Sequence, residues 1–233
     1  MKLPSTHPVD LAAELAGPAG ACLRAGRTSE GYWTFIGPFG GVSAATALRA
    51  VLERDPACKG YVQPLLYFKG FLALQSHRVG HWLWGEGREA MAFYLQSRVS
   101  ELFQVDIHPA ASMGQGAFFD HGTGIVIGET ARIGDDVSML HGVTLGGTGA
   151  ERGDRHPKIR RGSLISLGAK VLGNIEIGEY SRVGAGSVVL TAVPAGCTAV
   201  GFPAKLVNCK GSERPSHEMN HIIDEHTGRE FET

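Results

Sequence analysis

An aliphatic or similar residue at every sixth position constrains this chain more than any other feature. The spacing begins at Ile107 and continues to about Leu206, with a two-residue slip near Ile125 and a longer interruption after Leu145. A helix repeats its buried face every 3.6 residues and a strand every two residues, so neither element explains the period. A solenoid explains it, because each six-residue unit forms one short strand and one turn, and three units close a triangular coil. The unbroken final run comprises Ile159, Ile165, Val171, Ile177, Val183 and Val189.

The alternative, a β-sandwich of short strands, would not keep a strict six-residue phase over so long a stretch. We therefore predict an α+β protein in which a helical domain, residues 1–105, precedes a parallel β-helix, residues 106–207. Residues 208–233 are polar and charged, which predicts a tail that is mobile or only conditionally ordered. Helical patterns and Gly or Pro breaks predict helices at Val42–Arg54, Leu65–Trp84 and Arg88–Phe103, with a weaker pattern at Val9–Ala16.

Composition and charge exclude several classes of partner. The net charge is −1 and the isoelectric point about 6.8, so neither a nucleic acid nor an anionic membrane is expected as a partner. The chain does not open on a signal peptide, and charged residues interrupt its most apolar helix, so we predict a cytoplasmic protein with no membrane span. The cysteines are scattered along the chain, which predicts reduced thiols and neither disulfides nor a zinc site. They are Cys22, Cys58, Cys197 and Cys209.

The solenoid geometry brings two histidines together. A coil of three hexapeptides is eighteen residues long, so residues eighteen apart stack in neighbouring coils. His121 and His141 are twenty residues apart, and the two-residue slip near Ile125 accounts for the difference. We therefore expect the two side chains in neighbouring coils, about one strand spacing of 4.8 Å apart.

The segment from Gly146 to Lys158 leaves the six-residue phase and returns to it, which predicts a loop that projects from a corner of the coil. The loop carries Asp154, Arg155 and His156, and its cationic and hydrogen-bonding groups suit a carboxylate ligand.

At these residues the chain resembles a known family, the serine O-acetyltransferases, which are hexapeptide-repeat enzymes that open cysteine biosynthesis. The resemblance covers about Asp55 to Val207. It is carried by Asp55-Pro56, Pro64–Phe71, Gly80–Trp84, Phe103–Ala110, Asp120–Gly124, Val143–Gly149 and Gly153–Lys158. A hexapeptide repeat by itself indicates only an acyltransferase or a relative, and the helical domain and the Gly-Asp-Arg-His-Pro loop narrow it to this family.

The resemblance implies direct transfer of an acetyl group from acetyl-CoA to the hydroxyl of L-serine in a ternary complex, without an acyl-enzyme. His121 would be the general base, which suits an imidazole because its ordinary pKa of about 6.5 lies near working pH. Asp106 would accept a hydrogen bond from the other ring nitrogen and stabilise the imidazolium that forms.

The same resemblance assigns the binding residues. Asp55 and Asp120 would contact the ammonium group of the serine substrate, whereas Arg155 and His156 would clamp its carboxylate. The acetyl-CoA co-substrate would be lined by Gly147, Thr148, Leu167 and Gly168. Leu167 departs from the small, glycine-rich unit common at this position in the family, which would alter the fit of the CoA arm or of the acyl group.

Further expectations also come from the family. They are a left-handed coil, a homotrimer or a dimer of trimers, and inhibition by L-cysteine bound at the serine site. Many relatives finish in an isoleucine that docks into a sulfhydrylase, whereas this chain finishes in Thr233, so we expect no tight complex with that partner. Alternative functions are a related acyltransferase with another acyl-CoA or acceptor, such as homoserine or an amino sugar, and a non-catalytic scaffold that regulates a sulfhydrylase.

Each candidate residue also has a structural interpretation, such as a helix end for Asp55 or side-chain packing for His77 and His81. Trimeric hexapeptide proteins include the γ-class carbonic anhydrases, but the solenoid of this chain has no pair of histidines at the H-x4-H ligand spacing of that family. The segment His217–His221 matches the H-E-x-x-H zinc pattern, but it lies in the polar tail, so we interpret it as a chance match and predict no metal.

Overall fold

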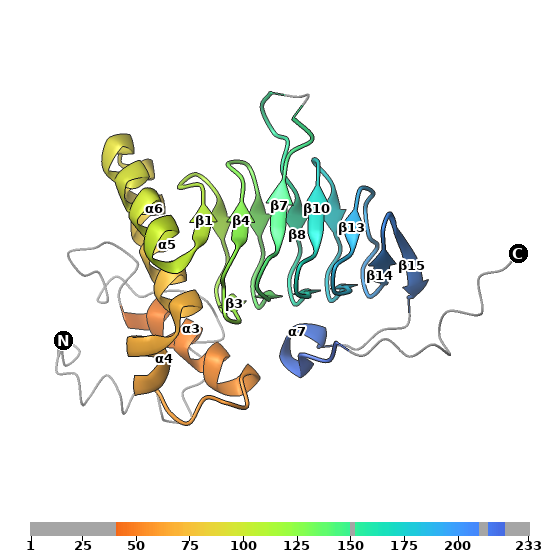
Figure 1. The fold of residues 1–233 in the computed structure, drawn as a ribbon, viewed down its shortest axis with the longest axis horizontal. Coiled ribbons are helices and arrows are strands. Elements are labelled where there is room, and N and C mark those ends of the chain that lie inside the picture. Colours follow the sequence, from red (N-terminus) through yellow and green to blue (C-terminus); the bar gives the residue numbers. More distant parts are fainter. Residues whose placement is uncertain (1–40, 150–151, 210–213, 222–233) are drawn as a thin grey trace, which may run out of the picture.

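The computed structural model describes residues 41–149, 152–209 and 214–221. The predicted helix at Val9–Ala16, Cys22 and Thr233 lie outside these residues. Helices occupy one end of the molecule and a parallel β-solenoid the rest, with a loop that projects between β7 and β8 (Figure 1). The helices are α3 (Gly41–Arg54), α4 (Val62–Tyr67), α5 (Lys69–Gly85), α6 (Glu89–Phe103) and, after the solenoid, α7 (Pro215–Glu218).

Three sheets form the faces of the solenoid, and every pairing between coils is parallel. The first sheet contains β1 (Val105–Ile107), β4 (Ile125–Ile127), β7 (Thr144–Gly146), β10 (Lys170–Leu172) and β13 (Val188–Val189). The second contains β2 (Ser112–Met113), β5 (Arg132–Ile133), β8 (Lys158–Ile159) and β11 (Glu176–Ile177). The third contains β3 (Phe118–Phe119), β6 (Ser138–Met139), β9 (Leu164–Ile165), β12 (Arg182–Val183), β14 (Thr198–Gly201) and β15 (Ala204–Asn208).

The six-residue period corresponds to the interior of this prism. Ile127 pairs with Leu145, which pairs with Val171, and all three side chains are buried. The solenoid predicted from the periodicity is therefore confirmed. Strands of two or three residues could not bury enough apolar surface alone, so the stacked column of aliphatic side chains holds the coils in register.

The helical prediction was wrong at one point. The single helix expected at Leu65–Trp84 is broken at Phe68, where the backbone is extended with φ −85° and ψ 102°. The break allows Phe68 to pack against a second apolar cluster that includes Phe71 and Phe118, while Gly70 lies directly against the solenoid. Tertiary packing therefore overrides the continuous helical pattern.

A buried arginine joins α3 to the solenoid. The Arg54 side chain donates hydrogen bonds to the Gly116 carbonyl at 2.9 Å, to the Ser138 hydroxyl at 3.2 Å and to Asp136 at 3.0 Å. Burial lowers the pKa of this guanidinium, and the neighbouring Asp136 carboxylate opposes that shift.

Part of the predicted polar tail packs against the folded domain. In residues 214–221, the Ser216 carbonyl accepts a hydrogen bond from Ser138 at 2.7 Å, and His217 Nε2 lies 3.2 Å from the Arg54 guanidinium. Met219 packs against the same apolar cluster as Phe68. This segment is therefore ordered by contacts that its polar composition did not indicate.

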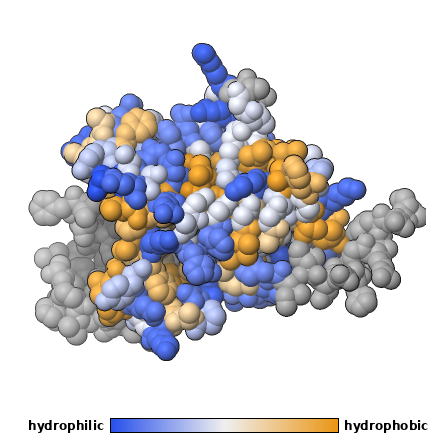
Figure 2. Space-filling model, in the orientation of Figure 1, coloured by the Kyte–Doolittle hydropathy of each residue, from blue (hydrophilic) through white to orange (hydrophobic). Residues whose placement is uncertain are grey.

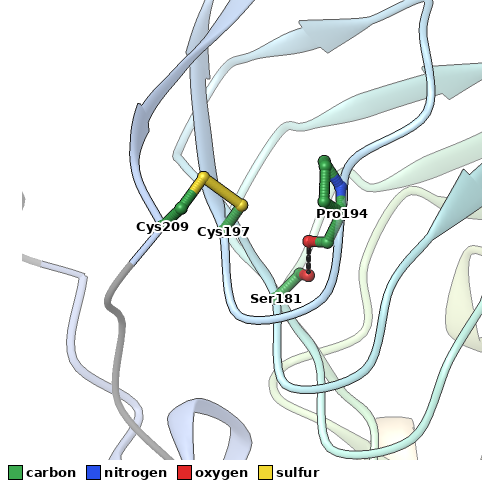
Figure 3. Close-up of a disulfide and its surroundings, with 4 residues drawn as sticks. All are labelled: Ser181, Pro194, Cys197 and Cys209. Carbon is green, nitrogen blue, oxygen red and sulfur yellow. Dashed lines mark hydrogen bonds between the residues drawn. A yellow bond between two sulfur atoms is a disulfide. The ribbon is translucent and has the colours of Figure 1, made fainter. Parts of the chain in front are cut away.

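The prediction of reduced cysteines was wrong for one pair. Cys197 and Cys209 form a disulfide, whose surroundings include the hydrogen bond from Ser181 Oγ to the Pro194 carbonyl (Figure 3). The antiparallel pairing of β14 with β15 brings their Cα atoms to 3.8 Å, a proximity that sequence spacing alone did not indicate. Cys58 is a free thiol. None of the helices in the described ranges combines the length and apolar character needed to span a membrane.

The contact at Gly70 gives a test of the junction between helices and solenoid. A Cβ atom at this position would lie 2.1 Å from the carbonyl oxygen of Phe119, so Gly70→Ala must push α5 away from β3. We expect a loss of about 1–3 kcal/mol in the free energy of unfolding, measured by urea denaturation. Gly85→Ala on the same helix is the matched control, because a Cβ atom there meets nothing within 4 Å. Equal stability of the two variants would contradict the tight junction.

Candidate active site

The predicted site residues lie mainly at two corners of the prism, one at each end of the strands of the first sheet. The histidine corner comprises residues 120–124, 140–143 and 166–169, which precede β4, β7 and β10. The loop corner comprises residues 128–131 and the described part of 147–157, which follow β4 and β7. Because the first sheet lies between the two corners, a single chain presents the two sets of predicted site residues at opposite edges of that sheet.

The histidine corner presents an accessible imidazole. The His121 side chain is 71% exposed, and its Nε2 atom lies 3.8 Å from a carboxylate oxygen of Asp120. His121 also has a positive φ of 57°, an uncommon conformation that the turn around Gly122 and the stacked coils hold in place. The predicted proximity of His121 and His141 is confirmed, with ring centroids 5.7 Å apart in an edge-to-face arrangement.

Asp106 lies in β1 between two buried residues, Val105 and Ile107, so its side chain faces outward. Its Oδ1 atom accepts a hydrogen bond of 2.6 Å from Gln96 Nε2 on α6. Within the described part of this single chain, Asp106 and His121 share no hydrogen bond. The predicted catalytic pair therefore remains a prediction.

At the loop corner, Thr130 organises the end of the projecting loop. Its hydroxyl oxygen accepts hydrogen bonds from the backbone N–H groups of Arg155 at 3.0 Å and His156 at 3.1 Å. Its own backbone N–H donates to His156 Nδ1 at 3.2 Å, and its hydroxyl lies 2.9 Å from the same ring atom. The backbone of the loop and the imidazole are therefore held by one residue.

These contacts determine the tautomer of His156. Because the Thr130 N–H can donate only to an unprotonated nitrogen, the proton of the neutral ring resides on Nε2, which is then a hydrogen-bond donor. Burial lowers the pKa of His156, and the nearby Arg155 charge lowers it further, so the ring stays neutral at neutral pH. A Cβ atom on Gly128 would lie 2.0 Å from His156 Nε2, so glycine is required beneath the ring.

Ion pairs hold the cations of the loop. Arg155 donates to Glu129 at 2.8 Å, and this hydrogen bond lowers the pKa of the Glu129 carboxyl. Lys158 donates to Asp154 at 2.5 Å and to the Thr130 carbonyl at 3.0 Å. The corner thus offers a guanidinium and a neutral imidazole donor, a set suited to a carboxylate.

The predicted CoA-lining residues divide between the corners in the same way. Leu167, 38% exposed, and Gly168 lie at the histidine corner, whereas Gly147 and Thr148 lie at the loop corner. Asp55 directly follows α3. Its Oδ1 atom accepts the backbone N–H of Ala57 at 2.8 Å, which forms the turn that ends α3.

Sequence reasoning missed several residues that contact these corners. Thr130, Glu129 and Gln96 support predicted site residues, and the position of Gly128–Thr130 one coil before the loop was the signal available in the sequence. His221, interpreted as part of a chance motif, places its Nδ1 atom 3.2 Å from Ser166 Oγ at the histidine corner.

Within the described ranges, no group of three or more His, Cys, Asp and Glu side chains is arranged to hold a metal ion. The two histidines of the H-E-x-x-H match face different partners, since His217 contacts Arg54 and His221 contacts Ser166.

Comparison with known proteins identifies the family. Residues 40–76 match the family model described as serine acetyltransferase, N-terminal. The chain is 60% identical over 178 residues to a serine acetyltransferase of Salmonella typhimurium, an alignment that covers 76% of this chain and 65% of the relative. It is 59% identical over 178 residues to a serine acetyltransferase of Escherichia coli K12, with the same coverage. The chain thus spans just under two thirds of the length of these curated relatives.

Solved structures agree with this result. A serine acetyltransferase in complex with cysteine superposes with a TM-score of 0.76 at 54% identity, covering 78% of this chain and 71% of that one. The Vibrio cholerae serine acetyltransferase gives a TM-score of 0.76 at 49% identity, covering 92% of this chain and 76% of that one. The chain therefore belongs to the serine acetyltransferase family.

Proposed function

We propose that this chain is a serine O-acetyltransferase, which transfers the acetyl group of acetyl-CoA to the hydroxyl of L-serine. The observation that carries the proposal is the pair of corners with complementary chemistry in a chain of this family. One corner has an exposed imidazole beside the Asp120 carboxylate, and the other has a guanidinium–imidazole pair on the loop. Solved relatives that contain CoA or serine support the same ligands here.

His121 acts as the general base. It removes the proton of the serine hydroxyl as the oxygen attacks the thioester carbonyl carbon, the C–S bond of acetyl-CoA breaks, and the CoA thiolate leaves and takes up a proton. Asp106 orients the imidazole and stabilises the imidazolium during this step. The His121 side chain is 71% exposed in the isolated chain, so a substrate can reach the ring.

The amino-acid substrate is held by opposite charges. Its ammonium group binds Asp120 next to His121, together with Asp55. Its carboxylate binds Arg155 and the Nε2–H group of His156. A sugar acceptor lacks this pair of opposite charges, which favours an amino acid.

The complete site forms between two subunits of a homotrimer. In a ring with three-fold symmetry, each contact joins two different surfaces, so the histidine corner of one chain meets the loop corner of the next. This arrangement unites the base and the carboxylate clamp, which the first sheet separates within one chain.

Two trimers then associate through their helical ends. Figure 2 shows apolar surface on the helical end as well as on the solenoid. The exposed apolar side chains of α4 are Val62, Leu65, Leu66 and Tyr67. A surface of this kind favours association between copies of the chain.

L-Cysteine inhibits the reaction by occupying the serine site. Cysteine carries the same ammonium and carboxylate groups as serine and differs only in its thiol, so the same clamp accepts it. The solved relative in complex with cysteine supports this assignment.

A first test measures CoA release from acetyl-CoA with L-serine, L-homoserine, glucosamine or no acceptor. We expect turnover that depends on L-serine, and a loss of about 10²–10⁴-fold in kcat for His121→Ala, because the base is removed. Thermal melting checks that the variant remains folded. Serine-dependent turnover that survives the substitution would exclude His121 as the base, and turnover with another acceptor alone would exclude serine as the substrate.

A second test addresses the shared site. His121→Ala and His156→Ala are each expected to be inactive, and co-expression of the two should restore about a quarter of the wild-type activity. Three quarters of randomly mixed trimers contain both variants, and in each of these one interface of three keeps both histidines. The two variants purified separately and assayed together without subunit exchange are the control. A site contained within one chain predicts no recovery.

A third test concerns Thr130. Thr130→Val removes the hydroxyl that holds the Arg155 and His156 amides, and we expect the KM for L-serine to rise about 10-fold while the KM for acetyl-CoA changes little. Thr130→Ser retains the hydroxyl and serves as the matched control. An unchanged KM for L-serine in Thr130→Val would show that the carboxylate clamp does not depend on this residue.

A further inference from the structure

A glutamine on the last helix before the solenoid contacts the proposed catalytic carboxylate. Gln96 lies in α6, and its Nε2 atom donates the 2.6 Å hydrogen bond to Asp106 Oδ1 described above. Ala92 and Val99, four residues before and three after Gln96, are the buried residues of this helix. Helical spacing therefore places Gln96 on the inward face. A polar side chain in such a position needs a partner, and Asp106 provides it.

A second contact joins the same helix to the coil that carries His121. Helix α6 ends at Phe103. Its C-cap residue, Gln104, has a left-handed conformation with φ 56°, and β1 begins at the next residue. The Gln104 carbonyl accepts a hydrogen bond of 2.7 Å from the backbone N–H of Gly124, three residues after His121. Helix α6 therefore contacts both Asp106 and the histidine corner.

We propose that Gln96 is a positioning residue, which holds the Asp106 carboxylate in the orientation that His121 requires. This role rests on the proposed function, because it assigns Asp106 as the partner of the general base. Gln96 touches neither substrate nor the reacting atoms, and it acts through Asp106.

The chemistry of an amide suits this role. The amide occupies Oδ1 and leaves Oδ2 free to accept the N–H of His121. A lysine or arginine at this position would also orient the carboxylate, but its charge would cancel part of the negative charge that stabilises the imidazolium. A neutral donor fixes the geometry and leaves that charge available to the histidine.

The expected effect is on the rate of the chemical step. A carboxylate held close to His121 stabilises the imidazolium that forms when the ring takes the serine proton. Loss of the Gln96 hydrogen bond lets the carboxylate move, so less of this stabilisation is available and kcat falls. The other titratable groups near these side chains are Asp120 and His141 beside His121, and His108, on which the charge of Asp106 acts.

The test compares Gln96→Met, which removes the donor and keeps a side chain of similar length, with Arg98→Met, a position on the same helix whose side chain is 43% exposed. For Gln96→Met we expect kcat to fall about 10-fold, with the KM values for both substrates within about twofold of wild type. Arg98→Met should leave kcat and both KM values unchanged. Thermal melting checks that the variants remain folded.

A double-mutant cycle with Asp106→Asn separates positioning from packing. If Gln96 acts only through Asp106, the double variant should be no slower than Asp106→Asn alone. Multiplicative losses in kcat, or a kcat in Gln96→Met equal to that of wild type, would overturn the proposal and leave Gln96 as a packing residue.

A readout without turnover keeps this proposal distinct from the proposed function. The environment of the His121 ring can be followed by NMR on ¹³C-histidine-labelled protein, with the signal assigned by its loss in His121→Ala. A His121 signal that moves in Gln96→Met, while Arg98→Met matches wild type, supports the positioning role, even if wild type shows no serine-dependent turnover. An identical His121 signal in all three proteins overturns it.

Discussion

The stacking of short coils on a column of buried aliphatic side chains is the interaction on which the rest of the structure depends. Each strand has only two or three residues in most coils, and its backbone groups are satisfied by the next coil, as in the bond of 2.9 Å from Val126 N–H to the Val143 carbonyl. Ile127, Leu145 and Val171 fill the interior behind these bonds. Because the coils cannot slide without exposing this column, residues at the corners have fixed positions.

The fixed corners explain how a solvent-accessible histidine can keep a defined position. His121 adopts a positive φ on the surface, and the neighbouring coil holds it beside His141 and Asp120. His156, in contrast, is buried and has its tautomer set by Thr130. The exposed ring can exchange protons with a substrate, whereas the buried ring is a fixed hydrogen-bond donor. The two environments suit the different roles proposed for these histidines.

Polar contacts join segments that are far apart in the sequence. Arg54 at the end of α3 reaches Ser138 and Asp136 in the second coil, and His217 of the tail lies against the same guanidinium. Charged and polar groups of this kind are buried only when each has partners. Such partners come from the folded arrangement, so the ordered part of the tail could not be recognised from its polar composition.

The sequence by itself determined the solenoid, the projecting loop and the adjacency of His121 and His141, because a six-residue repeat records the same local geometry many times over. The site residues were predicted from a family resemblance. Thr130 and Gln96, which support them, were not predicted, because no repeat or motif marks a side chain that acts by hydrogen-bonding another site residue. Only the tertiary structure decided the break at Phe68, the pairing of Cys197 with Cys209 and the separation of the two corners. These features depend on which surfaces come into contact once the coils have closed. The periodicity along the chain carries no information about those contacts.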